Sequence, residues 1–267
     1  MNRTNLISQT GWRCLTIGIT AIVSFASEAV SSAEAIDPNA TRILQSMSAY
    51  LAATPAFSVN TDIGWDVVTP NGQKLQLSSV ATVAVQRPGS FFIQRQGPVA
   101  QAEFIFDGKT LTVHGKRSNV YTQMTAPGTI DNAIRVFELQ TGFPAPGADL
   151  LFANPYAILS EGVESSTYLG KAYVNGVECH HLAFREAEVD WQLWVQTGDR
   201  PLPLKYTITS KWQTAAPQYE MRLRDWVTNP QIKANQFTFS APPGARKLPA
   251  LPASELDEFT PTPGGQS

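Results

Sequence analysis

The sequence predicts a mainly β fold with helices (α+β), built on one antiparallel sheet. Apolar and polar residues alternate over long stretches, as they do on strands with a single buried face. Three tight-turn pairs, Asn71-Gly72, Asp107-Gly108 and Asn175-Gly176, separate such stretches. These pairs favour hairpins because both central residues accept positive φ. Hairpins indicate a meander of neighbouring strands and not parallel βαβ units.

The N-terminal residues have the features of a secretory signal peptide. Arg3 and Arg13 supply positive charge, and the apolar stretch LTIGITAIVSF, residues 15–25, follows. This stretch has the length of a signal-peptide core and is shorter than the roughly 20 residues that span a bilayer. We therefore expect export to the periplasm.

Small residues indicate where the signal peptide ends. Ser31 and Ala33 occupy the third and first positions before a cleavage site at Glu34, and cleavage after Ala26 is an alternative. An uncleaved N-terminal anchor is the other alternative. We expect residues 1–33 to be removed, residues 34–247 to form a single β domain, and residues 248–267 to form a flexible, Pro-rich tail.

The charge balance excludes some partners. The whole chain has a formal net charge of −2, which becomes −3 when Arg3, Arg13 and Glu28 leave with the signal peptide. No Lys/Arg cluster is present, so the sequence lacks the basic footprint of a nucleic-acid-binding protein. Cys179 is the one cysteine left after cleavage, and stability must come from a packed core instead of an intramolecular disulfide.

The mature chain is expected to begin with a helix. Asp37 is a suitable N-cap, Pro38 fits the first helical position, and Thr54-Pro55 ends the helix. Its apolar stripe recurs every three or four residues and consists of Ala40, Leu44, Met47 and Leu51.

Strands are expected on both sides of a helical insert. The first group comprises residues 57–68, 74–86, 91–96, 102–106, 110–114 and 120–124. The second group comprises residues 167–174, 177–185, 189–196, 204–212, 218–227 and 236–239. Between them, residues 129–140 and 148–159 have helical periodicity, with a kink or restart at Pro155. An apolar insert needs a surface to pack on, and the apolar face of the sheet supplies one.

Cys179, His180 and His181 form the strongest candidate for chemistry, since thiolate and imidazole bind zinc and copper. Neighbouring side chains on a strand point to opposite faces, so only Cys179 and His181 can share a site. Two ligands are too few for a metal ion. We expect neither a metal nor a cofactor here, and a hydrolase or metalloprotein using Cys179 and His181 is a remote alternative.

Other catalytic patterns are missing. The sequence contains no Gly-x-Ser-x-Gly nucleophile elbow and no glycine loop for phosphate. Glu186, Glu188 and Asp190 lie together at an expected hairpin, where a solvated loop explains them. We therefore expect a protein that is not an enzyme.

Several strings resemble a known family. They are DGKTLTV (107–113), APGTIDNAI (126–134), DLLFANPYAIL (149–159), GVECHHLAFRE (176–186), DWQLWV (190–195), DRPLPLKYTIT (199–209) and FTFSAPPGARK (237–247). Together they resemble a family of predicted periplasmic bacterial proteins, domain of unknown function 2092. That family is similar to the lipoprotein-localisation (LolA/LolB-like) superfamily, which includes lipoprotein carriers and envelope-stress regulators. The resemblance implies a half-open, curved antiparallel sheet whose concave side is capped by helices.

A capped, curved sheet leads to a functional expectation. We expect a periplasmic monomer that binds an apolar ligand, a lipid or a lipoprotein acyl chain, in its concave cavity. An envelope-sensing module with a protein partner is the alternative. The expected lining residues are Val83, Val85, Phe104, Phe106, Trp191, Leu193, Tyr206, Ile208, Met221 and Leu223.

Overall fold

The fold is an open, curved antiparallel sheet in which two meanders meet side by side. A computed structural model describes residues 35–98, 100–233, 235–252 and 255, all within the compact unit Glu34–Ser267. The expected signal peptide and residues 253–254 and 256–267 of the expected tail lie outside the described residues. Among the described helices, none is long and apolar enough to cross a bilayer.

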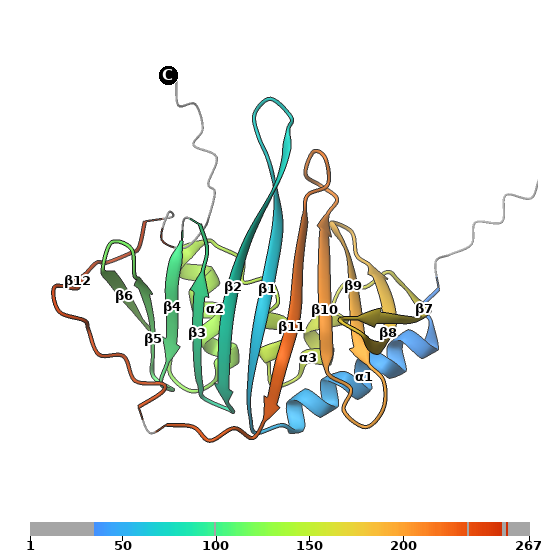
Figure 1. Cartoon of the computed structure of the whole chain (residues 1–267), viewed down its shortest axis with the longest axis horizontal. Helices are drawn as coiled ribbons and strands as arrows, with labels where there is room; N and C mark the ends of the chain where they lie inside the picture. Colours follow the sequence, from blue (N-terminus) through green and yellow to red (C-terminus); the bar gives the residue numbers. More distant parts are fainter. Residues whose placement is uncertain (1–34, 99, 234, 253–254, 256–267) are drawn as a thin grey trace, which may run out of the picture. The chain divides into compact units, whose positions relative to one another are not determined.

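The described strands form one sheet in the order β12-β6-β5-β4-β3-β2-β1-β11-β10-β9-β8-β7 (Figure 1). Their bounds are β1 Ala56–Val68, β2 Lys74–Gln86, β3 Ser90–Gln96, β4 Gln101–Phe106, β5 Thr110–Gly115, β6 Val120–Thr125, β7 Ser165–Val174, β8 Val177–Arg185, β9 Val189–Gln196, β10 Pro203–Ser210, β11 Gln218–Thr228 and β12 Arg246–Lys247. The first meander runs from β1 to β6 and the second from β7 to β11. They join at the centre, where β1 pairs with both β2 and β11.

Helix α1 (Pro38–Ala53) forms as the sequence predicts. The Asp37 side chain caps it by accepting from the backbone N–H of Asn39 at 2.7 Å, and Pro38 starts it. The other Asp37 carboxylate oxygen accepts from the Tyr168 backbone N–H at 2.9 Å, a contact that lowers the pKa of Asp37. The cap therefore also attaches the helix to strand β7.

The helical insert is divided into three elements. Helix α2 (Ile130–Thr141) is capped by Thr129, the 3-10 helix η1 spans Ala148–Leu151, and helix α3 (Pro155–Leu159) restarts after Asn154. The restart at the expected position, Pro155, follows from its missing N–H, which excludes it from a helix interior but suits a first turn.

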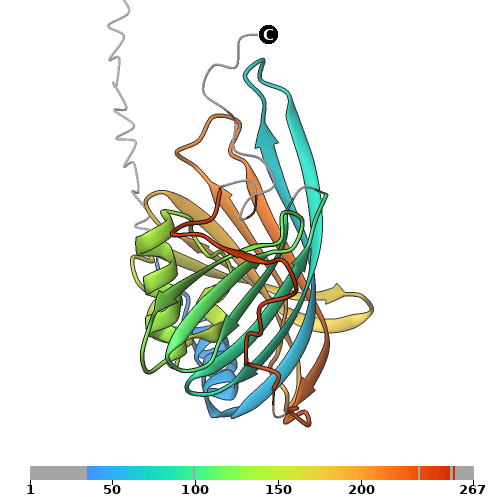
Figure 2. The ribbon, with the colours of Figure 1, turned by 90° about the vertical axis from the view of Figure 1, so that its left-hand side faces the viewer.

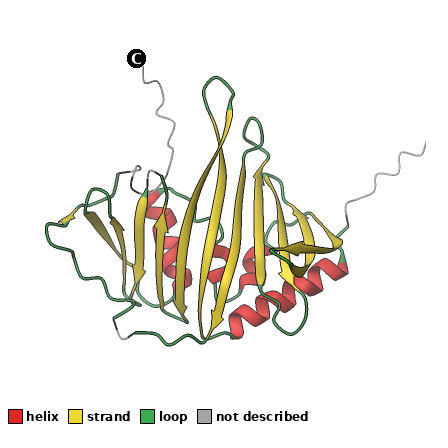
Figure 3. Ribbon diagram, in the orientation of Figure 1, coloured by secondary structure: helices red, strands yellow, loops and turns green. Residues whose placement is uncertain are grey.

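The helices lie on the concave side of the sheet, as Figures 2 and 3 show. Helix α1 packs against β7, β8, β9 and α3, whereas α2 packs against β5, β6 and η1. The predicted fold class is thus confirmed: a mainly β protein with a curved antiparallel sheet and helices on its concave face.

Two features of the C-terminal region differ from expectation. The prediction of a strand at residues 236–239 was wrong. The Gln236 N–H donates to the Lys233 carbonyl, and the segment forms a turn. Phe239 instead packs on the rings of His114 and Tyr121. Strand β12, which pairs in parallel with β6, was not expected.

The tail expected from residue 248 begins beside β6. The Leu248 N–H donates to the Tyr121 carbonyl at 2.8 Å, and the Thr122 hydroxyl donates to the Pro249 carbonyl at 3.2 Å. These contacts attach the first residues of the segment to the sheet edge.

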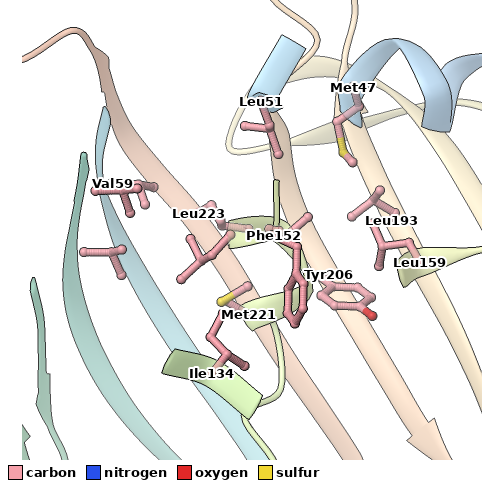
Figure 4. Packing of buried hydrophobic residues seen from close by; sticks show 14 of the residues in the cluster. Met47, Leu51, Val59, Ile134, Phe152, Leu159, Leu193, Tyr206, Met221 and Leu223 are labelled. Atoms are coloured by element: carbon pink, nitrogen blue, oxygen red, sulfur yellow. The ribbon is translucent and has the colours of Figure 1, made fainter. Parts of the chain in front are cut away.

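One hydrophobic core joins the helices to the concave face. Figure 4 shows part of it, with Met47 and Leu51 from α1, Leu193 from β9 and Tyr206 from β10. These residues are buried. The part of the concave face covered by α1 and α3 is therefore filled by side chains.

Candidate functional site

A cavity of about 320 Å³ lies between the other part of the concave face and the helical insert. Strands β1, β2, β3, β4, β5 and β11 contribute its floor, and α2, η1 and the segment between them contribute its cover. The lining residues are Phe57, Val59, Thr61, Ile63, Trp65, Ala81, Val83, Phe91, Ile93, Arg95, Phe104, Leu111, Ile134, Phe137, Phe143, Pro144, Ala145, Pro146, Gly147, Ala148, Leu150, Leu151, Tyr219, Met221, Leu223 and Trp226.

The floor is formed by alternate side chains of each strand. On β1, every second residue from Phe57 to Trp65 faces the cavity, because side chains two apart on a strand lie on the same face. Antiparallel pairing places Ile63 opposite Met221 and Trp65 opposite Tyr219 on β11. The floor is thus a continuous, largely apolar surface across the join of the two meanders.

The cover approaches the floor closely at Gly147. This residue has φ +83°, and a Cβ there would lie 2.7 Å from Cε of Met221. Such a distance is shorter than van der Waals contact, so a Cβ would displace the flexible end of Met221. The positive φ is the conformation that favours glycine here. Ile134 of α2 and Met221 of β11 both border this part of the cavity, and Figure 4 shows their side chains near each other.

Arg87, at the end of β2, holds the cover in place. Its guanidinium donates to the carbonyl of Leu151, the last residue of η1, at 2.6 Å and to that of Phe152, just after η1, at 3.0 Å. It also donates to the carbonyls of Leu150 at 3.4 Å and of Leu51, in the last turn of α1, at 3.2 Å. One side chain thus satisfies carbonyls from two covering elements.

Polar groups gather at one end of the cavity. Arg95 of β3 donates from Nε to the Ser79 hydroxyl at 3.2 Å, and its Cζ lies 5.0 Å from the centroid of the Trp65 ring. Burial raises the pKa of Tyr219 to about 12, although the positive charge of Arg95 acts in the opposite direction. Arg95 is the one charged side chain among the described residues that line the cavity.

The expected lining residues divide into two groups. The structure places Val83, Phe104, Met221 and Leu223 in the lining of the cavity. The others lie in or against the hydrophobic core beside it. These are Val85, Phe106, Trp191, Leu193, Tyr206 and Ile208. Their role in ligand binding stays a prediction.

Sequence analysis missed the contribution of β1 and of the segment 143–148. The alternation of Phe57, Val59, Ile63 and Trp65 was visible in the sequence, and it signals an apolar face on a central strand. The segment from Phe143 to Ala148 gave no such signal, because its Pro- and Gly-rich composition resembles an ordinary loop.

The residues of the Cys179-His180-His181 motif lie in separate surroundings. Cys179 is buried, which raises the pKa of its thiol to about 11. His180 contacts the Tyr168 hydroxyl at 3.0 Å. The His181 ring stacks on Trp194 with centroids 4.1 Å apart. Within the described residues, no group of three or more His, Cys, Asp or Glu side chains is placed to hold a metal ion.

A half-buried acidic group, Asp149, lies where η1 meets the second meander. Burial raises the pKa of Asp149 to about 6, and the Tyr206 hydroxyl donates to its carboxylate. Glu186 accepts from Trp191 Nε1 at 2.7 Å, and burial also raises its pKa. Glu186 is therefore not a fully solvated loop residue as expected, whereas Asp190 pairs with Arg185.

Comparison with known proteins gives a family. A family model described as a predicted periplasmic protein (DUF2092) matches residues 40–251, and this confirms the resemblance found in the sequence. No curated protein matches the chain.

Several solved structures are similar at low identity. One is an uncharacterized conserved protein from Thermus thermophilus, with 10% identity, a TM-score of 0.48, and coverage of 79% of this chain and 98% of that one. Another is the LolA superfamily protein NE2245 from Nitrosomonas europaea, with 11% identity, a TM-score of 0.40, and coverage of 75% and 97%. A third belongs to the MucA/MucB complex of Pseudomonas aeruginosa, with 15% identity, a TM-score of 0.42, and coverage of 76% and 62%.

Proposed function

The chain belongs to the DUF2092 family of predicted periplasmic proteins, and from this premise we propose that it is a non-enzymatic periplasmic protein that binds one apolar ligand. The ligand is an acyl chain, from a lipid or a lipoprotein. It lies in the cavity between the concave face and the helical insert.

One observation carries the proposal: the cavity is large enough for a ligand and its lining is mostly hydrocarbon. Its volume of about 320 Å³ falls within the range of roughly 300–1,000 Å³ of small-molecule sites. A water molecule occupies about 30 Å³, and a methylene group is of similar size. The cavity therefore suits a chain of about ten methylenes.

The binding energy supports this occupant. Burial of about ten methylenes at about 0.8 kcal/mol each gives a gross gain of about 8 kcal/mol. Association costs at least about 4 kcal/mol, so the hydrocarbon alone supplies an affinity of the order of millimolar. Tighter binding requires polar contacts at the mouth of the cavity or burial of more of the acyl chain under the cover.

The first experiment looks for a natural ligand. Protein purified from the periplasm is extracted with organic solvent, and the extract is examined by mass spectrometry. We expect a co-purified acyl compound, or, if purification removes it, saturable binding of a fluorescent fatty acid with one site per chain. A protein that yields no acyl compound and takes up no probe would contradict the proposal.

A cavity-filling variant localises the binding. Ala81 is buried and lines the cavity on β2, so Ala81→Leu places three more carbons in the ligand space. The matched control is Ser78→Leu, at an exposed position on the same strand. We expect Ala81→Leu to weaken probe binding by about tenfold or more and Ser78→Leu to leave it unchanged.

Export is tested by N-terminal sequencing of the periplasmic protein. Cleavage after Ala33 gives a chain that begins at Glu34, and cleavage after Ala26 gives one that begins at Ser27. A chain that still begins at Met1 and pellets with membranes would show an uncleaved anchor instead.

Envelope sensing through a protein partner remains a second candidate, favoured by the edge strand β7. This strand ends the sheet, and it exposes two large side chains, Leu169 at 52% and Tyr173 at 70%. The start of this edge already pairs with Ile36 at Ser166, and the part of the strand beyond Tyr168 is the part that can pair with a strand of another chain. Crosslinking in cells distinguishes the functions, because a sensor gives one or two partners and a lipoprotein carrier gives many.

A further inference from the structure

A second cavity, of about 250 Å³, lies beside the cavity under the helical insert, which is called the first cavity from here on. It is formed by the β7–β8 turn, the start of β10 and the ends of β9 and β11. The lining residues are Val174, Asn175, Val177, Gln196, Arg200, Leu202, Leu204, Leu223, Arg224, Asp225 and Trp226. Leu223 and Trp226 line both cavities, so the two spaces meet at these side chains.

The second cavity lies where the sheet divides. The pairing of β10 with β11 ends at Lys205 and Arg222, although both strands continue beyond this level. Pro203 of β10 has no N–H to donate to a ladder. Asp225 of β11 has φ +56° at the point where the register of β11 against β1 shifts, as it does at a bulge. Side chains, and not a backbone ladder, therefore separate the cavities here.

Trp226 closes the division between the two strands. Its Nε1 donates to the Pro203 carbonyl of β10 at 3.1 Å. Its ring centroid lies 5.3 Å from that of Phe57, a lining residue of the first cavity. A rotation of the Trp226 side chain would break this hydrogen bond but no pair of the backbone ladder, and it would join the two spaces.

The lining of the second cavity changes from apolar to polar. Val174, Leu202 and Leu204 are buried, whereas Asn175 and Arg200 are exposed. An amphiphile fits this arrangement, because its hydrocarbon lies on the buried apolar side while its head stays in water beside exposed polar groups.

We infer that the ligand is a long-chain amphiphile of about 16 carbons, whose acyl chain occupies both cavities and whose polar head lies beside Asn175 and Arg200. This inference rests on the proposed function and specifies its ligand. From the head, the chain passes Leu223 and Trp226 and then runs from Phe57 along β1.

The volumes support this length. At about 30 Å³ for each methylene or head atom, the second cavity of about 250 Å³ holds about eight of them beyond the ten or so in the first cavity. Each further buried methylene raises the affinity about fourfold. A ligand that fills both cavities therefore binds more tightly than the first cavity alone allows.

The test is a series of saturated fatty acids with even chain lengths from eight to sixteen carbons. Each acid displaces a fluorescent fatty acid from delipidated protein, below the concentration at which it forms micelles. With the native chain we expect the affinity to rise about three- to fourfold per methylene over the whole series. An affinity that stops rising at about ten carbons would overturn the inference and leave apolar binding standing. If no acid of the series binds, the proposed function fails as well.

A variant and a control assign the additional affinity to the second cavity. Val177 lines this cavity and is 38% exposed, so Val177→Trp fills part of the space from its outer side. We expect the variant to bind the ten-carbon acid as the native chain does, and the sixteen-carbon acid about tenfold more weakly or worse. The matched control is Val80→Trp, since Val80 is 44% exposed and lines neither cavity; both affinities should stay unchanged. A Val177→Trp chain that binds the longer acid as tightly as the native chain would place the additional carbons elsewhere and overturn the inference.

Photolabelling of the native protein decides the question even if Val177→Trp does not fold. The probe is a sixteen-carbon fatty acid with a diazirine next to its carboxyl group, and labelled peptides are identified by mass spectrometry. We expect labels in residues 174–177 and 200–204, around the outer side of the second cavity. Labels in residues 143–148 of the cover, with none at the second cavity, would place the head at the first cavity and overturn the inference.

Discussion

Removal of the Arg87 side chain should loosen the cover of the cavity. In Arg87→Met, the hydrocarbon stem stays but the carbonyls of Leu150, Leu151 and Phe152 lose the guanidinium donor. The Leu51 carbonyl also loses it but keeps the Thr54 N–H. A hydrogen bond from a charged donor contributes about 1.5–3 kcal/mol. The two shorter bonds, to Leu151 and Phe152, account for most of the lost stability. Water that reaches the freed carbonyls offsets part of the loss. We therefore expect the free energy of unfolding to fall by about 2–4 kcal/mol.

Urea denaturation followed by tryptophan fluorescence measures this change. With a slope of about 2–3 kcal/mol per molar urea for a domain of this size, the midpoint should fall by about 1 M. Arg117→Met is the control, because Arg117 is exposed and donates to one carbonyl, that of Pro98; its midpoint should hardly move. Arg87→Met with an unchanged midpoint would show that the four contacts do not stabilise the fold, and the role assigned to Arg87 would be wrong.

Three further results are expected. Gly147→Ala should lower the melting temperature at least as much as Gly162→Ala. Both sites have positive φ, and only the first would also displace the flexible end of Met221, 2.7 Å from the added Cβ. A smaller loss for Gly147→Ala would contradict this. The pKa of Asp149 is raised to about 6, so the folded state binds this proton more tightly than the unfolded state. The group therefore lowers the free energy of unfolding as pH rises from about 4 to 6. Asp149→Asn should remove this pH dependence, which is measured as the change, between about pH 4 and 6, in the difference between the urea midpoints of the variant and the native chain. The Cys179 thiol, buried and with its pKa at about 11, should react with a thiol reagent only when urea unfolds the chain, and rapid labelling of the native protein would contradict its burial.

The strands were predictable because alternation and turn residues agree along most of the chain. Strand β2, Lys74–Gln86, has the expected bounds, and the helix after Asp37 has the expected cap and end. Both depend on local rules, the period of the side chains and the preferences of caps and turns. Strand β12 has only two residues, and its pairing with β6 depends on a contact far along the sequence, which no local pattern reveals.

The location of the cavity was only partly predictable for a related reason. Alternation identifies which residues face the concave side, but it does not tell which part of that side a helix covers. Trp191 and Tyr206 face that side and were expected to contact a ligand. Both are buried in the core, on the half of the sheet beneath α1 and α3.

The two halves of the concave face are therefore covered differently. Over β7, β8 and β9 the long apolar stripe of α1 packs into the curve of the sheet, and this half forms hydrophobic core. The cavity half is covered by α2, η1 and a Pro- and Gly-rich segment that brings several small residues, such as Pro144 and Ala145, to the lining. Between this cover and the apolar floor a cavity extends along β1 from Phe57 to Trp65. This is the cavity in which we propose that the acyl chain lies.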